Sequence, residues 1–300
     1  MIFWLELIHT VCFTKAWDLP ASGRSVRKEV MKKEAFYRTP MALGVLAFCL
    51  TVAGCATTPP ISLSDRQTII DRIVASTAKV MIEQGGHRLS TGSGVVIASR
   101  AERPGLDAVS YVLTAAHVVE GSDGAQVIVR FTGADAIHGR FQATIFCRGN
   151  PDTLDLALLR VPGIAVPPAI FPVSEDQIRL GEGILLVGFP WGKRLGLFGG
   201  IVSQMPTDGD AKSSADEGTD PTIVVDAASA KGVSGGGVFR ESTGTLIGVV
   251  EGYQTASVAV KDRASTYSIN VPMPGETFVV PIPRIRRFLQ ESGVDGTAGH

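Results

Sequence analysis

Short runs of β-forming residues, separated by glycine, proline and polar turn residues, most constrain the fold of this chain. One set of six, AKVMIEQ, GSGVVIAS, SYVLTAA, AQVIVRF, FQATIFC and LALLRV, lies between residues 78 and 165. A second set of six, ILLVGF, FGGIVSQM, TIVVDAA, GGVFR, LIGVVEGYQ and TFVVPI, follows a Pro-rich crossover. Two comparable sets favour two β-barrels over one long sandwich. We therefore predict an all-β fold of two six-stranded antiparallel barrels, at about residues 78–165 and 170–283.

Helical patterns lie at both ends of this β-rich region. Ser64 stands where a helix N-cap is expected, ahead of apolar residues at helical spacing, and residues 283–290 have the composition of a closing helix. The predicted folded domain therefore covers residues 64–291, with a tail at 292–300. Residues 206–221 are polar and turn-rich, which is typical of a mobile surface loop.

The composition limits the kinds of molecule that this chain is expected to bind. The chain has 300 residues, 45% of them hydrophobic, and a formal net charge of −1, so it can bury a large core and has no basic excess to attract nucleic acid. Of four cysteines, Cys147 alone lies in the predicted domain, so no disulfide is expected there. The cysteines and histidines have no metal-ligand spacing, so we predict neither a metal site nor a cofactor.

The first 60 residues are typical of a processing signal. An apolar run at 41–54 follows Lys32, Lys33 and Arg38, as in a secretory signal, and is short for a membrane span. It ends in VAGC, which resembles the bacterial lipobox and implies lipidation of Cys55. We therefore predict an upstream extension and signal at 1–54 and a lipidated tether at 55–63. An uncleaved anchor or a plain secretory peptide is the alternative.

Two neighbouring residues refine that prediction. Met31 precedes the lysines and is a natural start for a signal peptide, so the true start of translation is predicted there. Ala56 follows the lipobox cysteine, and the sorting rule of enteric lipoproteins then implies the outer membrane, facing the periplasm. Acyl chains on Cys55 would provide the membrane affinity, at roughly 0.8 kcal/mol per buried methylene.

Three segments contain the residue types that acyl transfer requires. In VLTAAHVV, small alanines after an apolar strand would let the imidazole of His117 lie close to backbone as a general base. In TLDLALLR, Asp155 precedes a strongly apolar strand, and an imidazole N–H is a suitable partner for a buried carboxylate. Each also has a simpler interpretation: His117 as a packing or surface residue, and Asp155 as a turn residue beside Asp152.

The third segment, DAASAKGVSGGG, is the most specific. A nucleophilic serine needs an exposed oxygen and nearby N–H groups directed at the developing oxyanion, and a glycine-rich bend permits both. Ser234 is the predicted nucleophile, and the N–H groups of Gly232 and Ser234 are the predicted oxyanion hole. A flexible glycine-rich turn is the alternative.

Taken together, these motifs resemble the chymotrypsin-like serine peptidases. TGSGVVI, LTAAHVV, DLALLRV and GVSGGGVF occur in the family's order of His, Asp and Ser, and VGFPWG, GGIVS and DAASAKGVSGG are similar to the bacterial HtrA/DegP branch. The likeness covers about residues 75–290. It implies a triad of His117, Asp155 and Ser234 in the cleft between two barrels.

The chain departs from that family at three points. Val233 stands where relatives usually have Asn or Asp, which makes the resting shape of the oxyanion loop uncertain. Ala228, six residues before Ser234, would line the base of the specificity pocket, and without an acid there cleavage after small or medium apolar residues is expected. No PDZ domain is expected after the predicted domain.

The resemblance implies a membrane-tethered serine endopeptidase acting on envelope or misfolded proteins, with protein or peptide substrates and an uncertain oligomeric state. The alternative is a catalytically weak or silent scaffold of the same fold that binds a partner peptide by strand addition. An esterase with the same triad is a third possibility.

Overall fold

The computed structural model describes residues 63–103, 106–132, 139–172, 178–206, 222–261 and 266–294. These residues all belong to one compact unit of the chain, Ile61–His300. The predictions for the signal, Cys55 and most of the tether lie outside the described residues, as do those for the loop at 207–221 and most of the tail.

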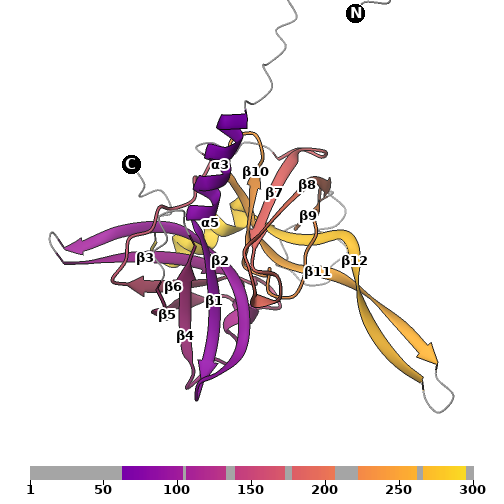
Figure 1. The fold of residues 1–300 in the computed structure, drawn as a ribbon, viewed down its shortest axis with the longest axis horizontal. Coiled ribbons are helices and arrows are strands. Elements are labelled where there is room, and N and C mark those ends of the chain that lie inside the picture. Colours follow the sequence, from indigo (N-terminus) through magenta and orange to yellow (C-terminus); the bar gives the residue numbers. More distant parts are fainter. Residues whose placement is uncertain are drawn as a thin grey trace, which may run out of the picture. The chain divides into compact units, whose positions relative to one another are not determined.

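The first barrel is a closed antiparallel sheet with the strand order β1-β2-β3-β6-β5-β4. Its strands are β1 (Thr77–Gln84), β2 (His87–Arg103), β3 (Leu106–Thr114), β4 (Gln126–Phe131), β5 (Phe141–Arg148) and β6 (Ala157–Pro162). β1 pairs with β4 to close the sheet (Figure 1).

The second barrel repeats this plan, with the order β10-β11-β12-β9-β8-β7. Its strands are β7 (Gly183–Gly188), β8 (Gly196–Gln204), β9 (Ile223–Asp226), β10 (Gly237–Arg240), β11 (Leu246–Lys261) and β12 (Thr266–Pro281). The predicted fold of two six-stranded antiparallel barrels is thus confirmed. β11 and β12 extend well beyond the predicted runs, however, and form a paired arm that the sequence analysis did not anticipate.

Side-chain alternation explains how each sheet closes around a core. In β5 exposed residues alternate with less exposed ones, whereas β4, β6 and β7 are buried over most of their length. β-branched residues such as Val80, Val129 and Val161 fill the first barrel, and Ile184, Val202 and Val225 belong to the core of the second. A third apolar cluster joins the barrels and includes Leu113, Leu185 and Phe239. This shared cluster fixes the seam at which the candidate site lies.

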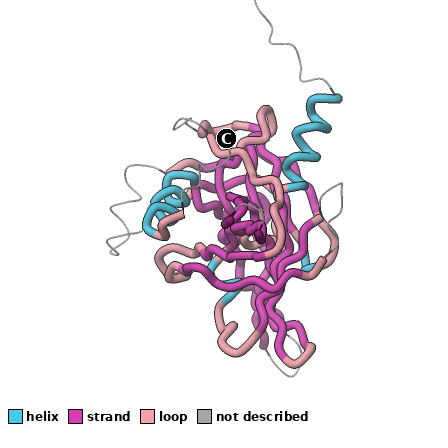
Figure 2. Tube along the Cα trace, turned by 90° about the vertical axis from the view of Figure 1, so that its left-hand side faces the viewer, coloured by secondary structure: helices cyan, strands magenta, loops and turns pink. Residues whose placement is uncertain are grey.

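In the part of the chain that the structure describes, two α-helices pack at the margin of the strands (Figure 2). α3 (Leu63–Ala75) buries Ile69 and Ile73, and α5 (Ile282–Glu291) buries Ile285 and Phe288, all in the cluster between the barrels. Ser64, predicted as an N-cap, lies one residue inside α3. No helix in the described part of the chain is long and apolar enough to span a bilayer.

Candidate active site

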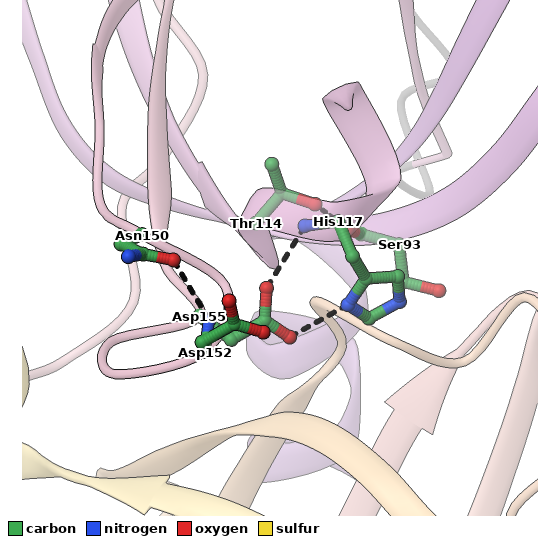
Figure 3. A network of polar contacts seen from close by, with 6 residues as sticks. All are labelled: Ser93, Thr114, His117, Asn150, Asp152 and Asp155. Atoms are coloured by element: carbon green, nitrogen blue, oxygen red, sulfur yellow. Dashed lines mark hydrogen bonds and ion pairs between the residues drawn. The ribbon is translucent and has the colours of Figure 1, made fainter. Parts of the chain in front are cut away.

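His117 and Asp155 form a two-point contact between adjoining loops of the first barrel (Figure 3). His117 lies in the 3-10 turn η1 (Ala116–Val119), just after β3, and Asp155 lies two residues before β6. The backbone N–H of His117 donates to Asp155 Oδ1 over 2.8 Å, and Nδ1 of the ring lies 2.6 Å from Oδ2. The contact directs Nδ1 to the carboxylate and leaves Nε2 as the ring nitrogen for a substrate or a nucleophile.

The Asp155 loop is held from both sides. Leu154 N–H donates to the carbonyl of Asn150, and Asp152 N–H donates to the Asn150 side chain, so Asp152 belongs to the turn and lies exposed (Figure 3). Arg284 of α5, which is buried, donates from Nη2 to the carbonyl oxygen of Thr153 over 2.6 Å. The sequence analysis did not identify Arg284 as part of the site.

Ser234 lies in the turn before β10, and its backbone is bonded to the first barrel. Ser93 N–H, on β2, donates to the carbonyl oxygen of Ser234 over 2.8 Å. The Ser93 hydroxyl donates to Gly232 O over 2.7 Å and accepts from Phe189 N–H over 2.9 Å. Thr114 Oγ1, beside η1, donates to Ser93 O over 2.6 Å. Ser93 therefore connects the Ser234 loop to the strands that lead to His117.

The backbone of this loop leaves two amides available. Gly232 has φ +95°, and the carbonyl of Lys231 accepts a 2.6 Å hydrogen bond from Trp191 N–H. Because C=O and N–H of one trans peptide point in opposite directions, the Gly232 N–H is directed away from Trp191. Within the described residues, the N–H groups of Gly232 and Ser234 donate to no acceptor. Both predicted oxyanion donors are therefore available to a ligand.

Val233 holds the loop in a different way from the Asn or Asp that relatives usually have at this position. Its side chain is fully buried in the apolar core of the second barrel, and its N–H donates to Ala230 O over 3.0 Å. The loop is thus fixed by apolar burial of Val233 and by the Ser93 hydroxyl.

Gly92 lies close to both the residue after His117 and the backbone of Ser234. A Cβ placed at Gly92 would lie 2.5 Å from the Val118 side chain and 3.1 Å from Ser234 O. No hydrogen bond joins the His117 ring to the Ser234 hydroxyl in the described structure. Contacts of this kind are often loose without substrate.

Electrostatics favour the protonated form of His117. The hydrogen bond to Asp155 is the main cause that raises its pKa, the negative charges of Asp155, Glu251 and Glu120 add to the effect, and burial opposes it. Glu251 on β11 has a raised pKa, first through burial and then through repulsion by Asp155, while Arg284 and His117 act in the opposite direction. Glu251 therefore lies within electrostatic range of the His117–Asp155 pair.

Two further predictions concern the specificity pocket and a metal site. Ala228 is exposed on the segment between β9 and the Ser234 turn, and its role in specificity stays a prediction. The described residues contain no cluster of three or more His, Cys, Asp or Glu that could hold a metal ion.

A family model for a trypsin-like peptidase domain matches residues 92–249, which include His117, Asp155 and Ser234. The chain belongs to the trypsin-like peptidase domain family. Among its curated relatives, a probable periplasmic DegP-like serine endoprotease of Pseudomonas putida (strain W619) is 31% identical over 223 residues, which cover 70% of this chain and 42% of the relative. The Do-like serine protease HtrA of Bacillus subtilis (strain 168) is 27% identical over 161 residues, covering 53% and 32%. This trypsin-like domain thus spans less than half the length of these relatives.

Solved structures share the fold of this trypsin-like domain. A serine endoprotease from Yersinia pestis superposes with a TM-score of 0.55 at 18% identity, over 78% of this chain and 67% of that one. A protein of M. tuberculosis H37Rv, crystallised in an inactive form, gives a TM-score of 0.52 at 21% identity, over 77% and 92%. Both similarities concern the fold alone.

Four residues of the site were not singled out from the sequence: Ser93, Thr114, Glu251 and Arg284. Ser93 and Thr114 lie inside the quoted motifs TGSGVVI and VLTAAHVV, so a signal was present there. The burial of Arg284 has no local signal, because it depends on how the closing helix packs.

Proposed function

We propose that this chain is a membrane-tethered serine endopeptidase that hydrolyses peptide bonds of envelope or misfolded proteins. The main support is the His117–Asp155 pair, bonded at two points, beside a Ser234 loop in which two amides are available. The curated relatives are named as serine proteases, several of them periplasmic, which agrees with this reaction and with a bacterial envelope location.

In the proposed mechanism, His117 Nε2 accepts the proton of Ser234 Oγ as the oxygen attacks the substrate carbonyl. Asp155 holds the ring through Nδ1 and stabilises the imidazolium that forms. The N–H groups of Gly232 and Ser234 stabilise the oxyanion. The imidazolium then protonates the leaving amine, and water hydrolyses the acyl-enzyme on Ser234 by the same route.

Hydrolysis of denatured β-casein tests this function, with fragments identified by mass spectrometry. The wild-type chain is expected to cleave the polypeptide, and Ser234→Ala is expected to leave it intact. Cleavage of p-nitrophenyl acetate by a wild-type chain that does not cleave casein would indicate an esterase instead.

The alternative is a weak or silent scaffold that binds a partner peptide. Val233, which stands where the resembling family usually has Asn or Asp, is the feature that favours it. A folded wild-type protein that binds denatured casein without cleaving it would support this alternative.

We also propose that Cys55 bears the lipid tether and that the chain lies at the outer membrane, facing the periplasm. The lipobox-like VAGC sequence supports the first point and Ala56 the second. Metabolic labelling with palmitate is expected in the wild type and lost in Cys55→Ala. Lipid that persists in Cys55→Ala would contradict the tether.

A further inference from the structure

The arm formed by β11 and β12 has one apolar and one polar face. Between Thr255–Pro272 and Lys261–Thr266 the two strands pair without a register shift. Facing residues of an antiparallel pair share a face. One face therefore contains the pairs Ala256–Val271, Val258–Ile269 and Val260–Tyr267, and the other contains Thr255–Pro272, Ser257–Asn270 and Ala259–Ser268.

The apolar face is uncovered in the described structure. Five of its large side chains are between 40% and 50% exposed: Val258, Tyr267, Ile269, Val271 and Met273. Figure 1 shows the arm projecting from the second barrel, apart from the other labelled elements. An isolated two-stranded hairpin is only marginally stable in water, so an arm with this face bare is well suited to bind a partner.

The outer edges of the arm are also unpaired in the described structure. β10 pairs with β11 only as far as Val249, and β9 pairs with β12 only between Thr277 and Val279. Pro272 and Pro274 lack an N–H and so limit pairing along β12, whereas β11 has no proline between Leu246 and Lys261. The β11 edge can therefore accept an extended strand, and the apolar face can pack its side chains.

The size and charge of the surface restrict the partner. The exposed parts of the five side chains amount to roughly 400 Å², about half of the ~800 Å² that each partner buries in a stable complex. This is too little for a lasting dimer of two arms alone. Residues 252–260 and 267–275 contain no Asp, Glu, Lys or Arg, and Lys261 falls in register with the polar face, so the apolar face offers no charge to an ionic partner. An uncharged, apolar, extended polypeptide fits both properties.

The arm is continuous with the candidate active site. β11 passes through Glu251, which is within electrostatic range of His117 and Asp155, and reaches Thr255 four residues later. At roughly 3.3 Å per residue, the apolar face begins at Ala256, about 17 Å along the strand from Glu251, and continues for about 13 Å to Val260. A substrate must therefore extend several residues beyond the reacting bond to reach it.

We propose that the arm is a secondary binding surface for extended apolar segments of unfolded polypeptides. It holds them by packing on the face of Val258, Ile269 and Val271 and by strand addition along β11, while another part of the same polypeptide occupies the cleft. This inference rests on the proposed peptidase function only in treating the bound polypeptide as substrate.

Binding and turnover are tested separately. The probe is fluorescein-labelled α-lactalbumin, reduced and carboxymethylated so that it stays unfolded, and the background is Ser234→Ala, in which nothing is cleaved. One variant adds Val258→Thr, Ile269→Thr and Val271→Thr. Its matched control adds Ser257→Thr, Ala259→Thr and Ser268→Thr on the polar face. Thr retains β-propensity in both, and circular dichroism establishes that each variant is folded.

Fluorescence anisotropy is expected to give a Kd about tenfold higher for the apolar-face variant, since lost apolar contact directly weakens binding. The control is expected to stay within about twofold of the background protein. Equal Kd values for the two variants would overturn the proposal. So would light scattering that shows a wild-type dimer and an apolar-face monomer, or phosphatidylcholine vesicles that bind the wild type alone.

With Ser234 restored, the apolar-face variant is expected to lose rate on the unfolded polypeptide relative to a four-residue peptide amide, which is too short to reach the arm. If the wild type cleaves neither substrate while the difference in Kd persists, the result contradicts the peptidase function and supports binding by the arm. If cleavage occurs and the difference in Kd is absent, the result supports the peptidase function and contradicts binding by the arm.

Discussion

The hydroxyl of Ser93 donates a 2.7 Å hydrogen bond to the carbonyl oxygen of Gly232, from a strand of the first barrel to the Ser234 loop of the second. The Ser93 hydroxyl oxygen also accepts from Phe189 N–H, so one buried hydroxyl connects three segments. We therefore expect Ser93 to be a positioning residue that acts on the Gly232 and Ser234 amides through the backbone.

Ser93→Ala is expected to lower kcat for a peptide substrate about tenfold with little change in KM, which is less than the ~10²–10³-fold loss when an oxyanion donor is itself removed. Ser110→Ala is the matched control, because that buried hydroxyl also donates to a carbonyl and accepts from an amide, within the first barrel alone. Both variants should lose about 1–3 kcal/mol of unfolding free energy in urea. An equal loss of kcat in both would refute a specific role for Ser93.

Val233→Asn is expected to destabilise the protein rather than improve the loop. The side chain is buried among apolar residues, where an amide without a partner costs about 1–3 kcal/mol. Chemical denaturation measures this change, and Val233→Ala gives the effect of lost packing alone. An Asn variant as stable as wild type and more active would contradict our account of the loop.

Activity is expected to rise with pH through the titration of His117. Only the neutral ring can act as a base, and its pKa is raised, mainly by the hydrogen bond to Asp155. The midpoint of kcat/KM against pH should therefore lie above the ordinary histidine value of about 6.5. The same shift implies that the stabilising effect of the pair is complete below about pH 6.5 and is lost as pH rises through the raised pKa. A midpoint below 6.5 would show that burial outweighs the carboxylate.

Glu251→Gln should move that midpoint to lower pH, because it removes a negative charge that raises the pKa of His117 while keeping the shape of the side chain. Glu120→Gln is the control and should produce a smaller shift, since Glu120 is the last and weakest of the causes. NMR titration of the His117 ring measures both. Equal shifts in the pKa of His117 would mean that Glu251 affects the ring no more than Glu120 does.

Asp155→Asn is expected to lower kcat roughly 10⁴-fold, because an amide cannot stabilise the imidazolium and favours the wrong tautomer. Asp152→Asn is the matched control three residues away, exposed in the turn at Asn150. It should retain wild-type kcat within about twofold. If Asp152→Asn loses activity and Asp155→Asn does not, Asp152 rather than Asp155 would be the residue that stabilises the imidazolium.

The barrels could be predicted because each strand has a local signal: β-branched runs between turn residues, with alternation where one face is exposed. The pairing of His117 with Asp155 followed from chemistry, since a buried carboxylate needs a partner. Two features required the three-dimensional structure. Arg284 and Ser93 act across distant segments, and no local pattern predicts which hydroxyl meets which carbonyl.

The arm was missed for a different reason. Pro272 and Pro274 argue against a strand at 266–281, and residues 255–261 are small and mixed in polarity. Only the register of β11 with β12 shows that alternate residues assemble one apolar face.

The most direct test of the central claim is the intact mass of the protein after treatment with a fluorophosphonate, followed by peptide mapping. We predict one adduct on Ser234 in the wild type, none in Ser234→Ala and far slower labelling in His117→Ala, because the histidine activates the hydroxyl. Folded wild-type protein that stays unlabelled at pH 8, or an adduct that persists in Ser234→Ala, would contradict the account.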